Sequence, residues 1–134
     1  MMSSNKKLLF DTHAFLAFFN REEGSETIKN LMDMIQAGNA EGFVATVTLT
    51  ELAYIYTRKA DAASARVRVM QIQHSKLNLI PLTVEIAVDA GIIKRPGISV
   101  ADAIIASSAL SVGASVVTKD PHFSQMGVGV TGYP

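Results

Sequence analysis

The sequence predicts an α/β protein in which a central parallel sheet of four to five strands carries helices on both faces. Short apolar or β-branched runs alternate with longer amphipathic stretches along the chain, which is the pattern of a parallel sheet with crossover helices. The 134 residues include 49% hydrophobic and 18% charged side chains, a composition typical of a well-packed core. Because no linker, repeat or low-complexity segment interrupts the alternation, we expect a single domain over residues 1–134.

The composition also excludes several classes of protein. The chain has no cysteine, which rules out disulfides, zinc sites with thiolate ligands and cysteine nucleophiles. No run approaches the roughly eighteen apolar residues of a membrane helix. The apolar run over residues 14–19 is short and lacks the basic flank of a signal peptide. We therefore expect a cytoplasmic protein.

The first element is a buried strand over residues 6–10, which ends at Asp11 and is followed by a helix over residues 12–19. An acid directly after a buried strand is costly to place without a partner, and open α/β sheets bind their ligands at this end of the strands. Asp11 is therefore a candidate site residue. The alternative is that it only caps the following helix.

A helix is expected over residues 22–37, with its apolar face at Ile28, Leu31, Met32 and Ile35 and its acids in the first turn. A strand over residues 43–46 follows. The next helix is expected over residues 48–59, with Thr48 as N-cap and Glu51 three residues later. Glu51 thus repeats the placement of an acid just after a strand. Its alternative role is that of the acid in a capping box.

The middle of the chain is its most basic part. A helix is expected over residues 61–76, a strand over 77–81, and a helix over 83–94 with Val84, Ala87, Val88 and Gly91 facing inward. Basic side chains here and near the last strand are candidates for contact with an RNA backbone, the alternative being a solvated helix face. They are Arg58, Lys59, Arg66, Arg68 and Lys119.

The last helix is expected over residues 99–110, between an N-cap at Ser99 and a glycine stop at Gly113, with Val100 and Ile104 on its buried face. Asp102 lies in its first turn, where the helix dipole favours a charged carboxylate. The alternative is a capping box formed by Ser99 and Asp102.

A strand over residues 115–118 ends two residues before Asp120, which repeats the position of Asp11. Residues 127–134 form a tail that has room for a short last strand. Its glycines match G-x-G-x-x-G, but only two residues follow, so no helix can present its N-terminus to a pyrophosphate. The match is therefore not a dinucleotide site.

Four carboxylates thus stand at strand ends or at the helix starts after them, which is one edge of an α/β sheet. They are Asp11, Glu51, Asp102 and Asp120. The charges of these carboxylates repel one another unless some of the acids are protonated or a hard cation neutralises them. Oxygen ligands favour Mg²⁺ or Mn²⁺. The chain has 12 basic and 12 acidic residues, so 8 acids would oppose the 12 cations elsewhere on the surface.

Four motifs occupy these positions in order: LLFDTHAFLAF around Asp11, TLTELAYIY around Glu51, SVADAIIASSAL around Asp102 and VVTKDPHF around Asp120. Through them the chain resembles PIN-domain ribonucleases of the VapC toxin type over nearly its whole length. The resemblance implies a groove in which the four acids bind Mg²⁺ or Mn²⁺ and a metal-activated water that cleaves RNA, leaving a 5′-phosphate and a 3′-hydroxyl. It also implies a homodimer and inhibition by a small antitoxin protein.

Three further residues have expected supporting roles. Thr118 matches the family's hydroxyl residue two before the last acid, which implies that it orients a carboxylate or a metal-bound water. His13 departs from the family's usual Asn or Ser, and His122 stands two residues after Asp120. Each is either a packing or hydrogen-bonding histidine or a site group that favours Mn²⁺ or supplies a proton.

Three other functions remain open from the sequence. One is metal-free RNA cleavage with His13 and His122 as base and acid, which leaves the four acids unexplained. Another is a binding protein on the same fold without catalysis. The third is an RNA-processing or DNA-directed nuclease, since a metal-bound hydroxide does not need the ribose hydroxyl.

Overall fold

The computed structural model describes residues 6–134 and contains one five-stranded, all-parallel sheet in the order β3-β2-β1-β4-β5. The strands are β1 (Lys6–Phe10), β2 (Ala40–Ala45), β3 (Asn78–Ile80), β4 (Ser115–Thr118) and β5 (Val130–Gly132). The helices are α1 (Thr12–Phe19), α2 (Ser25–Gln36), α3 (Thr46–Lys59), α4 (Ala62–Gln73), α5 (Val84–Ile93), α6 (Val100–Val112) and the 3₁₀ helix η1 (Pro121–Met126). The predicted fold class is confirmed, including a last strand in the tail.

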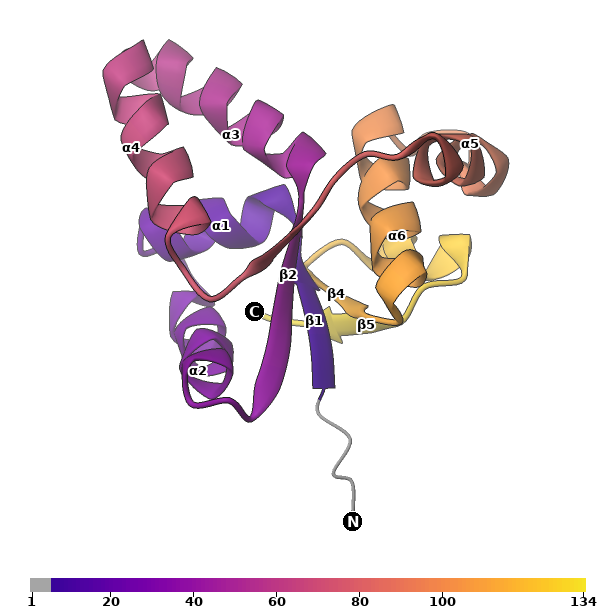
Figure 1. Ribbon diagram of the computed structural model, residues 1–134, viewed down its shortest axis with the longest axis horizontal. Helices are drawn as coiled ribbons and strands as arrows, with labels where there is room; N and C mark the ends of the chain where they lie inside the picture. Colours follow the sequence, from indigo (N-terminus) through magenta and orange to yellow (C-terminus); the bar gives the residue numbers. More distant parts are fainter. Residues whose placement is uncertain (1–5) are drawn as a thin grey trace.

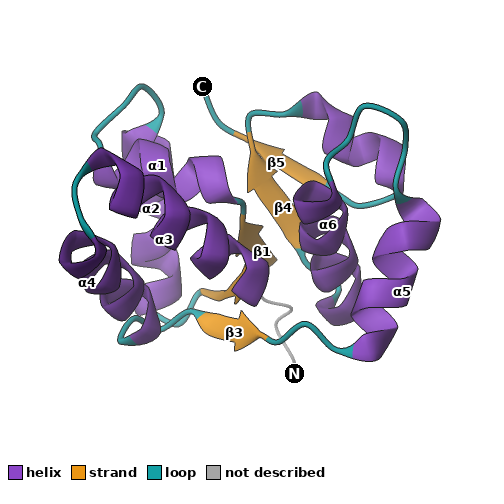
Figure 2. Ribbon diagram, turned by 90° about the horizontal axis from the view of Figure 1, so that it is seen from above, coloured by secondary structure: helices purple, strands orange, loops and turns teal. Residues whose placement is uncertain are grey.

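The sheet separates two helical layers (Figures 1 and 2). Alternate residues of β1 show the division, because Leu8 and Phe10 belong to one core while Leu9 belongs to the other. The first core is closed by α1 to α4, and the second by α5, α6 and η1. Within residues 6–134 no helix has the length and apolar character needed to cross a membrane.

The order in which strands are added to the sheet reverses at β1, the central strand. The chain first builds β2 and β3 on one side and then returns to place β4 and β5 on the other. The gap between the carboxyl ends of β1 and β4 is therefore a topological switch point, the position at which open α/β sheets bind ligands. Phe10 pairs with Val117, so Asp11 and Thr118 follow side by side at this point.

The predicted start of α3 was wrong. The helix begins at Thr46 after Ala45, which makes no side-chain capping hydrogen bond, so Thr48 is buried inside the helix and caps nothing. Glu51 consequently lies in the second turn, and the capping-box alternative for Thr48 and Glu51 is excluded. The start of α2 was also placed too early, since it begins at Ser25.

The predicted inner face of α5 was wrong as well. Ile86 and Ala90 are the buried residues of this helix, whereas Val84 is 82% exposed and Val88 is 56% exposed. Val100 of α6 is likewise exposed, while the caps predicted for that helix, Ser99 and Gly113, are confirmed. The exposed apolar residues of α5 form a second stripe that no described element covers.

Candidate acidic site at the carboxyl edge of the sheet

Asp11 is a buried carboxylate at the switch point. It caps α1, and its Oδ1 accepts a hydrogen bond from the Ala14 amide at 2.8 Å. Burial is the largest influence on this carboxyl and raises its pKa, and the nearby charge of Asp102 raises it further. Hydrogen bonds from Thr118 and Ala14 act in the opposite direction. Asp11 thus caps α1 as the alternative prediction had it, and it also lies near another acid.

Glu51 reaches the same edge from α3. The hydroxyl of Thr12, the first residue of α1, donates a hydrogen bond to Glu51 Oε1. The Thr12 and Thr48 hydroxyls lie 3.3 Å apart, and both residues are buried. The buried Thr12 hydroxyl therefore holds Glu51 and lies beside the buried Thr48 hydroxyl, where α1 packs against α3.

Asp102 interacts electrostatically with each of the other three acids. Its pKa is raised first by burial and then by the charges of Glu51 and Asp120. A hydrogen bond with Ser99 lowers it, and the Ser99 hydroxyl also accepts from the Asp102 amide at 3.0 Å. The capping interaction is thus present, but burial and repulsion between carboxylates outweigh it.

Asp120 is the N-cap of η1. Its Oδ1 accepts a hydrogen bond from the His122 amide at 2.8 Å and lies 2.7 Å from His122 Nδ1. The buried Thr118 hydroxyl accepts from the Asp120 amide at 2.9 Å and also bonds Asp11. Thr118 therefore links the acids that follow β1 and β4. His13 is exposed on α1 and its charge lowers the pKa of both Asp11 and Asp102, so it too lies beside the acids.

The structure thus brings the four predicted acids within reach of one another's charge. As the side chains stand in residues 6–134, no three His, Asp or Glu groups are close enough to hold a metal ion. The donor chemistry nevertheless fits a hard divalent cation, because the acids offer only carboxylate oxygens. Burial and repulsion both raise pKa values here, and a cation would relieve the repulsion.

The basic residues predicted to contact RNA have different surroundings in the structure. Arg68 stacks on Phe19 at 4.7 Å and lines a cavity between α1, α2 and α4, whereas Arg66 lines a groove between α3 and α4. Arg58 stacks on Tyr54 in α3. Lys119 lies beside the acidic site, with its Nζ 5.4 Å from the centre of the Tyr133 ring.

Reasoning from the sequence missed three hydroxyl residues at this edge: Thr12, Thr48 and Tyr133. The threonines carry no signal of their own, because their roles arise only when α1 packs against α3. Tyr133 follows Gly132, which pairs with Thr118, so the strand register places it at the same edge of the sheet. A register between β4 and the tail is not visible in the sequence.

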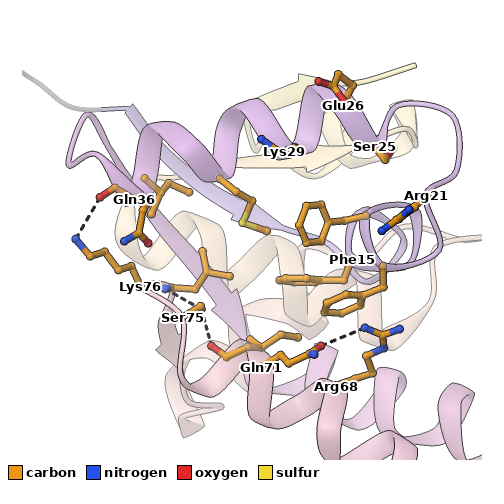
Figure 3. Close-up of a pocket in the computed structure, with 16 residues that line it drawn as sticks. Phe15, Arg21, Ser25, Glu26, Lys29, Gln36, Arg68, Gln71, Ser75 and Lys76 are labelled. Carbon is orange, nitrogen blue, oxygen red and sulfur yellow. Dashed lines mark hydrogen bonds between the residues drawn. The ribbon is translucent and has the colours of Figure 1, made fainter.

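A cavity of about 740 Å³ lies apart from the acids, and none of the four lines it. Phe15, Phe18 and Phe19 supply aromatic walls from α1 (Figure 3). The polar lining includes four cations and one acid: Arg21, Lys29, Arg68, Lys76 and Glu26. The cavity is therefore apolar inside and has a net positive rim.

Comparison with known proteins gives one family match. The model of the PIN domain family matches residues 8–129, which include all four acids. No curated protein sequence matches the chain at a significant level.

Among the solved structures with a similar fold, one is named as a toxin–antitoxin complex and another as a toxin. VapBC2 from Rickettsia felis, bound to a DNA fragment from its promoter, matches with a TM-score of 0.78 and 18% identity over 96% of this chain and 99% of the other. A toxin–antitoxin complex from Klebsiella pneumoniae matches with a TM-score of 0.61 and 18% identity over 84% and 86%. Mycobacterium tuberculosis VapC20, a toxin that cleaves the sarcin-ricin loop, matches with a TM-score of 0.70 and 16% identity over 90% and 95%.

Proposed function

The chain belongs to the PIN domain family, and we propose that it is an endoribonuclease that hydrolyses RNA phosphodiester bonds with Mg²⁺ or Mn²⁺. We assign residues 1–134 to a single nuclease domain. The observation that supports this function most is the electrostatic grouping of its acids. The pKa of Asp102 is raised first by burial and then by the charges of Glu51 and Asp120, and that of Asp11 is raised mainly by burial, with a smaller contribution from the charge of Asp102. Acids from four separate parts of the chain thus act on one another at the switch point of the sheet.

We assign the cation to the carboxylates of Asp11, Glu51, Asp102 and Asp120. When bound, it would activate water for attack and offset the charge of the phosphodiester. The surrounding residues orient these carboxylates: Thr118 and the Ala14 amide bond Asp11, and Thr12 bonds Glu51. His122 bonds Asp120, which favours an orienting role for this histidine.

The fold shared with toxin–antitoxin structures supports a toxin restrained by a small antitoxin protein in the cytoplasm. The cavity between α1, α2 and α4, with its aromatic walls from α1, offers that partner an apolar binding surface. Its net positive rim favours a segment with an apolar face and acidic flanks. Lys76 and Gln36, which bond at 3.2 Å, close one end of the cavity (Figure 3).

A homodimer is the proposed assembly, and α5 offers a surface for it. Val84, Val88 and Ile92 recur every four residues and are 82%, 56% and 70% exposed. Neighbouring exposed apolar side chains of this kind favour an interaction surface. We assign this stripe to the contact with a second copy of the chain.

The charges of α5 favour an antiparallel pairing of two copies. Glu85 and Asp89 lie in its body, and Lys94 and Arg95 follow its end, all exposed. A two-fold axis makes the same patch meet itself, so an antiparallel pair would bring the acids of one copy toward the cations of the other.

The nuclease assignment is tested by the Asp102→Asn variant. Purified wild-type protein is expected to cut RNA with Mn²⁺ or Mg²⁺ and to stop when EDTA is added. Asp102→Asn is expected to lose more than about 100-fold in cleavage rate, since it removes a charged ligand and keeps the side-chain shape. Asp33→Asn changes an exposed acid on α2 in the same way and should cut normally.

Retained cleavage by Asp102→Asn would overturn the assignment. Cleavage unaffected by EDTA would point instead to the metal-free histidine mechanism. Equal cleavage of single-stranded DNA would make the protein a general nuclease. Absence of any cleavage, together with binding of a partner protein, would leave a binding role on the same fold.

A further inference from the structure

Tyr133 holds a buried hydroxyl that has no hydrogen-bond partner in the described part of the chain. The residue is 8% exposed, and its Oη is a buried side-chain oxygen for which residues 6–134 provide no hydrogen bond. Such a group keeps its desolvation cost without a compensating bond and calls for a specific explanation. Phenylalanine would fill the same space without this cost.

The surroundings fix the ring in place. Gly24 lies against it, and a Cβ at that position would come 2.7 Å from Tyr133 Cδ2, so no side chain fits there. Gly24 also has a φ of 91°, which favours glycine. The Lys119 ammonium lies 5.4 Å from the ring centre. The hydroxyl is therefore held in a defined position.

That position lies next to the acidic site. Gly132, the last residue of β5, pairs with Thr118, whose hydroxyl bonds Asp11, and Tyr133 follows directly. Besides burial, the charges of Asp11 and Glu22 raise the pKa of Tyr133. Of these two charges, that of Asp11 has the larger influence, and Asp11 is the buried carboxylate of the pair.

We propose that Tyr133 is a positioning residue of the acidic site, whose hydroxyl donates a hydrogen bond to Asp11 through one bridging water. A water that joins two polar groups in this way is nearly as favourable as a direct hydrogen bond. The bond gives the carboxylate a third orienting donor beside Thr118 and the Ala14 amide. The value of this bond for cleavage rests on the proposed function.

The first test is a double-mutant cycle on the metal-free protein, with urea unfolding as the readout. Tyr133→Phe removes only the hydroxyl, and Asp11→Ser removes the carboxylate while keeping a residue that caps helices well. Tyr133→Phe is expected to lower the urea midpoint of the wild type and to raise or leave unchanged that of Asp11→Ser. A higher midpoint in both backgrounds would show an unused hydroxyl and overturn the inference.

Two controls make the cycle specific. Tyr56→Phe removes another largely buried hydroxyl, one that bonds Asn20 at 3.2 Å, and should combine additively with Asp11→Ser. Glu22→Gln removes the other charge that raises the pKa of Tyr133. Coupling of Tyr133→Phe to Glu22→Gln, with additivity toward Asp11→Ser, would overturn the inference.

The second test is the affinity for Mn²⁺, measured by titration calorimetry. Tyr133→Phe is expected to weaken binding about tenfold, the lower end of the effect of losing a residue that orients a metal ligand. Tyr56→Phe should bind as the wild type does. Should the wild type itself bind no Mn²⁺, the proposed function would fail, whereas the cycle on metal-free protein would still decide the role of Tyr133.

Discussion

The pKa of Asp102 is influenced by burial, by the charges of Glu51 and Asp120, and by a hydrogen bond with Ser99. The N-terminus of α6 and the hydrogen bond with Ser99 favour its charged form, while burial, Glu51 and Asp120 oppose it. Because the pKa is raised, the opposing influences are the larger. A carboxylate kept in this environment is costly unless a cation joins it, which is the physical basis of the proposed metal dependence.

The raised pKa values predict how stability depends on pH. Just above the ordinary carboxyl pKa of 3.8, the folded protein holds protons on Asp11 and Asp102 that the unfolded chain has released. The stability of the metal-free protein should therefore fall as the pH rises through the raised values. Asp102→Asn removes one of these groups and its repulsion, so the variant should melt higher at pH 7, by roughly 2–4 °C.

Thermal unfolding of both proteins without metal, from pH 4 to pH 7.5, checks this expectation. The melting temperature of the wild type should fall relative to that of Asp102→Asn as the pH rises. Asp33→Asn should follow the wild type, since its acid lies on the exposed surface of α2. Parallel profiles for wild type and Asp102→Asn would be incompatible with repulsion at Asp102.

At the level of residues, the sequence allowed the acids to be identified but not the groups that orient them. Asp11 and Asp120 follow apolar strands, a pattern that is readable in one dimension. The hydroxyls of Thr12 and Thr48 meet only after α1 packs on α3. Whether any of these residues binds a cation stays a prediction.

At the level of elements, α3 shows why helix starts are hard to predict. Its true N-cap is Ala45, which carries no capping side chain, while Thr48 resembles a cap because threonine is common in that role. Thr48 is instead buried beside Thr12. The misplaced start still left Glu51 on the correct helix, because the order of strand and helix was right.

Helix α5 shows a second limit of sequence patterns. Its sequence VEIAVDAGII has apolar residues on two sides, one with Ile86 and Ala90 and the other with Val84, Val88 and Ile92. Periodicity alone cannot say which stripe faces the core. The structure buries the first, and the second is left as the proposed contact between two copies.

The proposed dimer contact is tested by placing a charge on the exposed stripe. Val88→Glu is expected to convert a dimer into a monomer in sedimentation experiments, because an unpaired carboxylate would be buried in the interface. Val67→Glu makes the same change at a 52% exposed valine on α4 and should leave the dimer intact. A monomeric wild type, or a Val88→Glu dimer, would refute the contact.

At the level of the whole molecule, parallel topology gathers acids that are far apart in the sequence. All five strands point the same way, so their carboxyl ends share one edge, and the return of the chain past β1 sets Asp11 beside Thr118. This much follows from alternating strands and helices. The strand order and the choice of which helices cover which face, by contrast, depend on packing that the sequence pattern leaves open.

The central claim is that the four acids form one site that a divalent cation neutralises, and Mn²⁺-dependent thermal unfolding tests it most directly. At a hundredfold excess over its dissociation constant, Mn²⁺ should stabilise the wild type by about 2.7 kcal/mol. Asp102→Asn should respond much less to the same concentrations, and Asp33→Asn should respond fully. A wild-type melting temperature unmoved by millimolar Mn²⁺, or an equal rise in Asp102→Asn, would contradict the shared site.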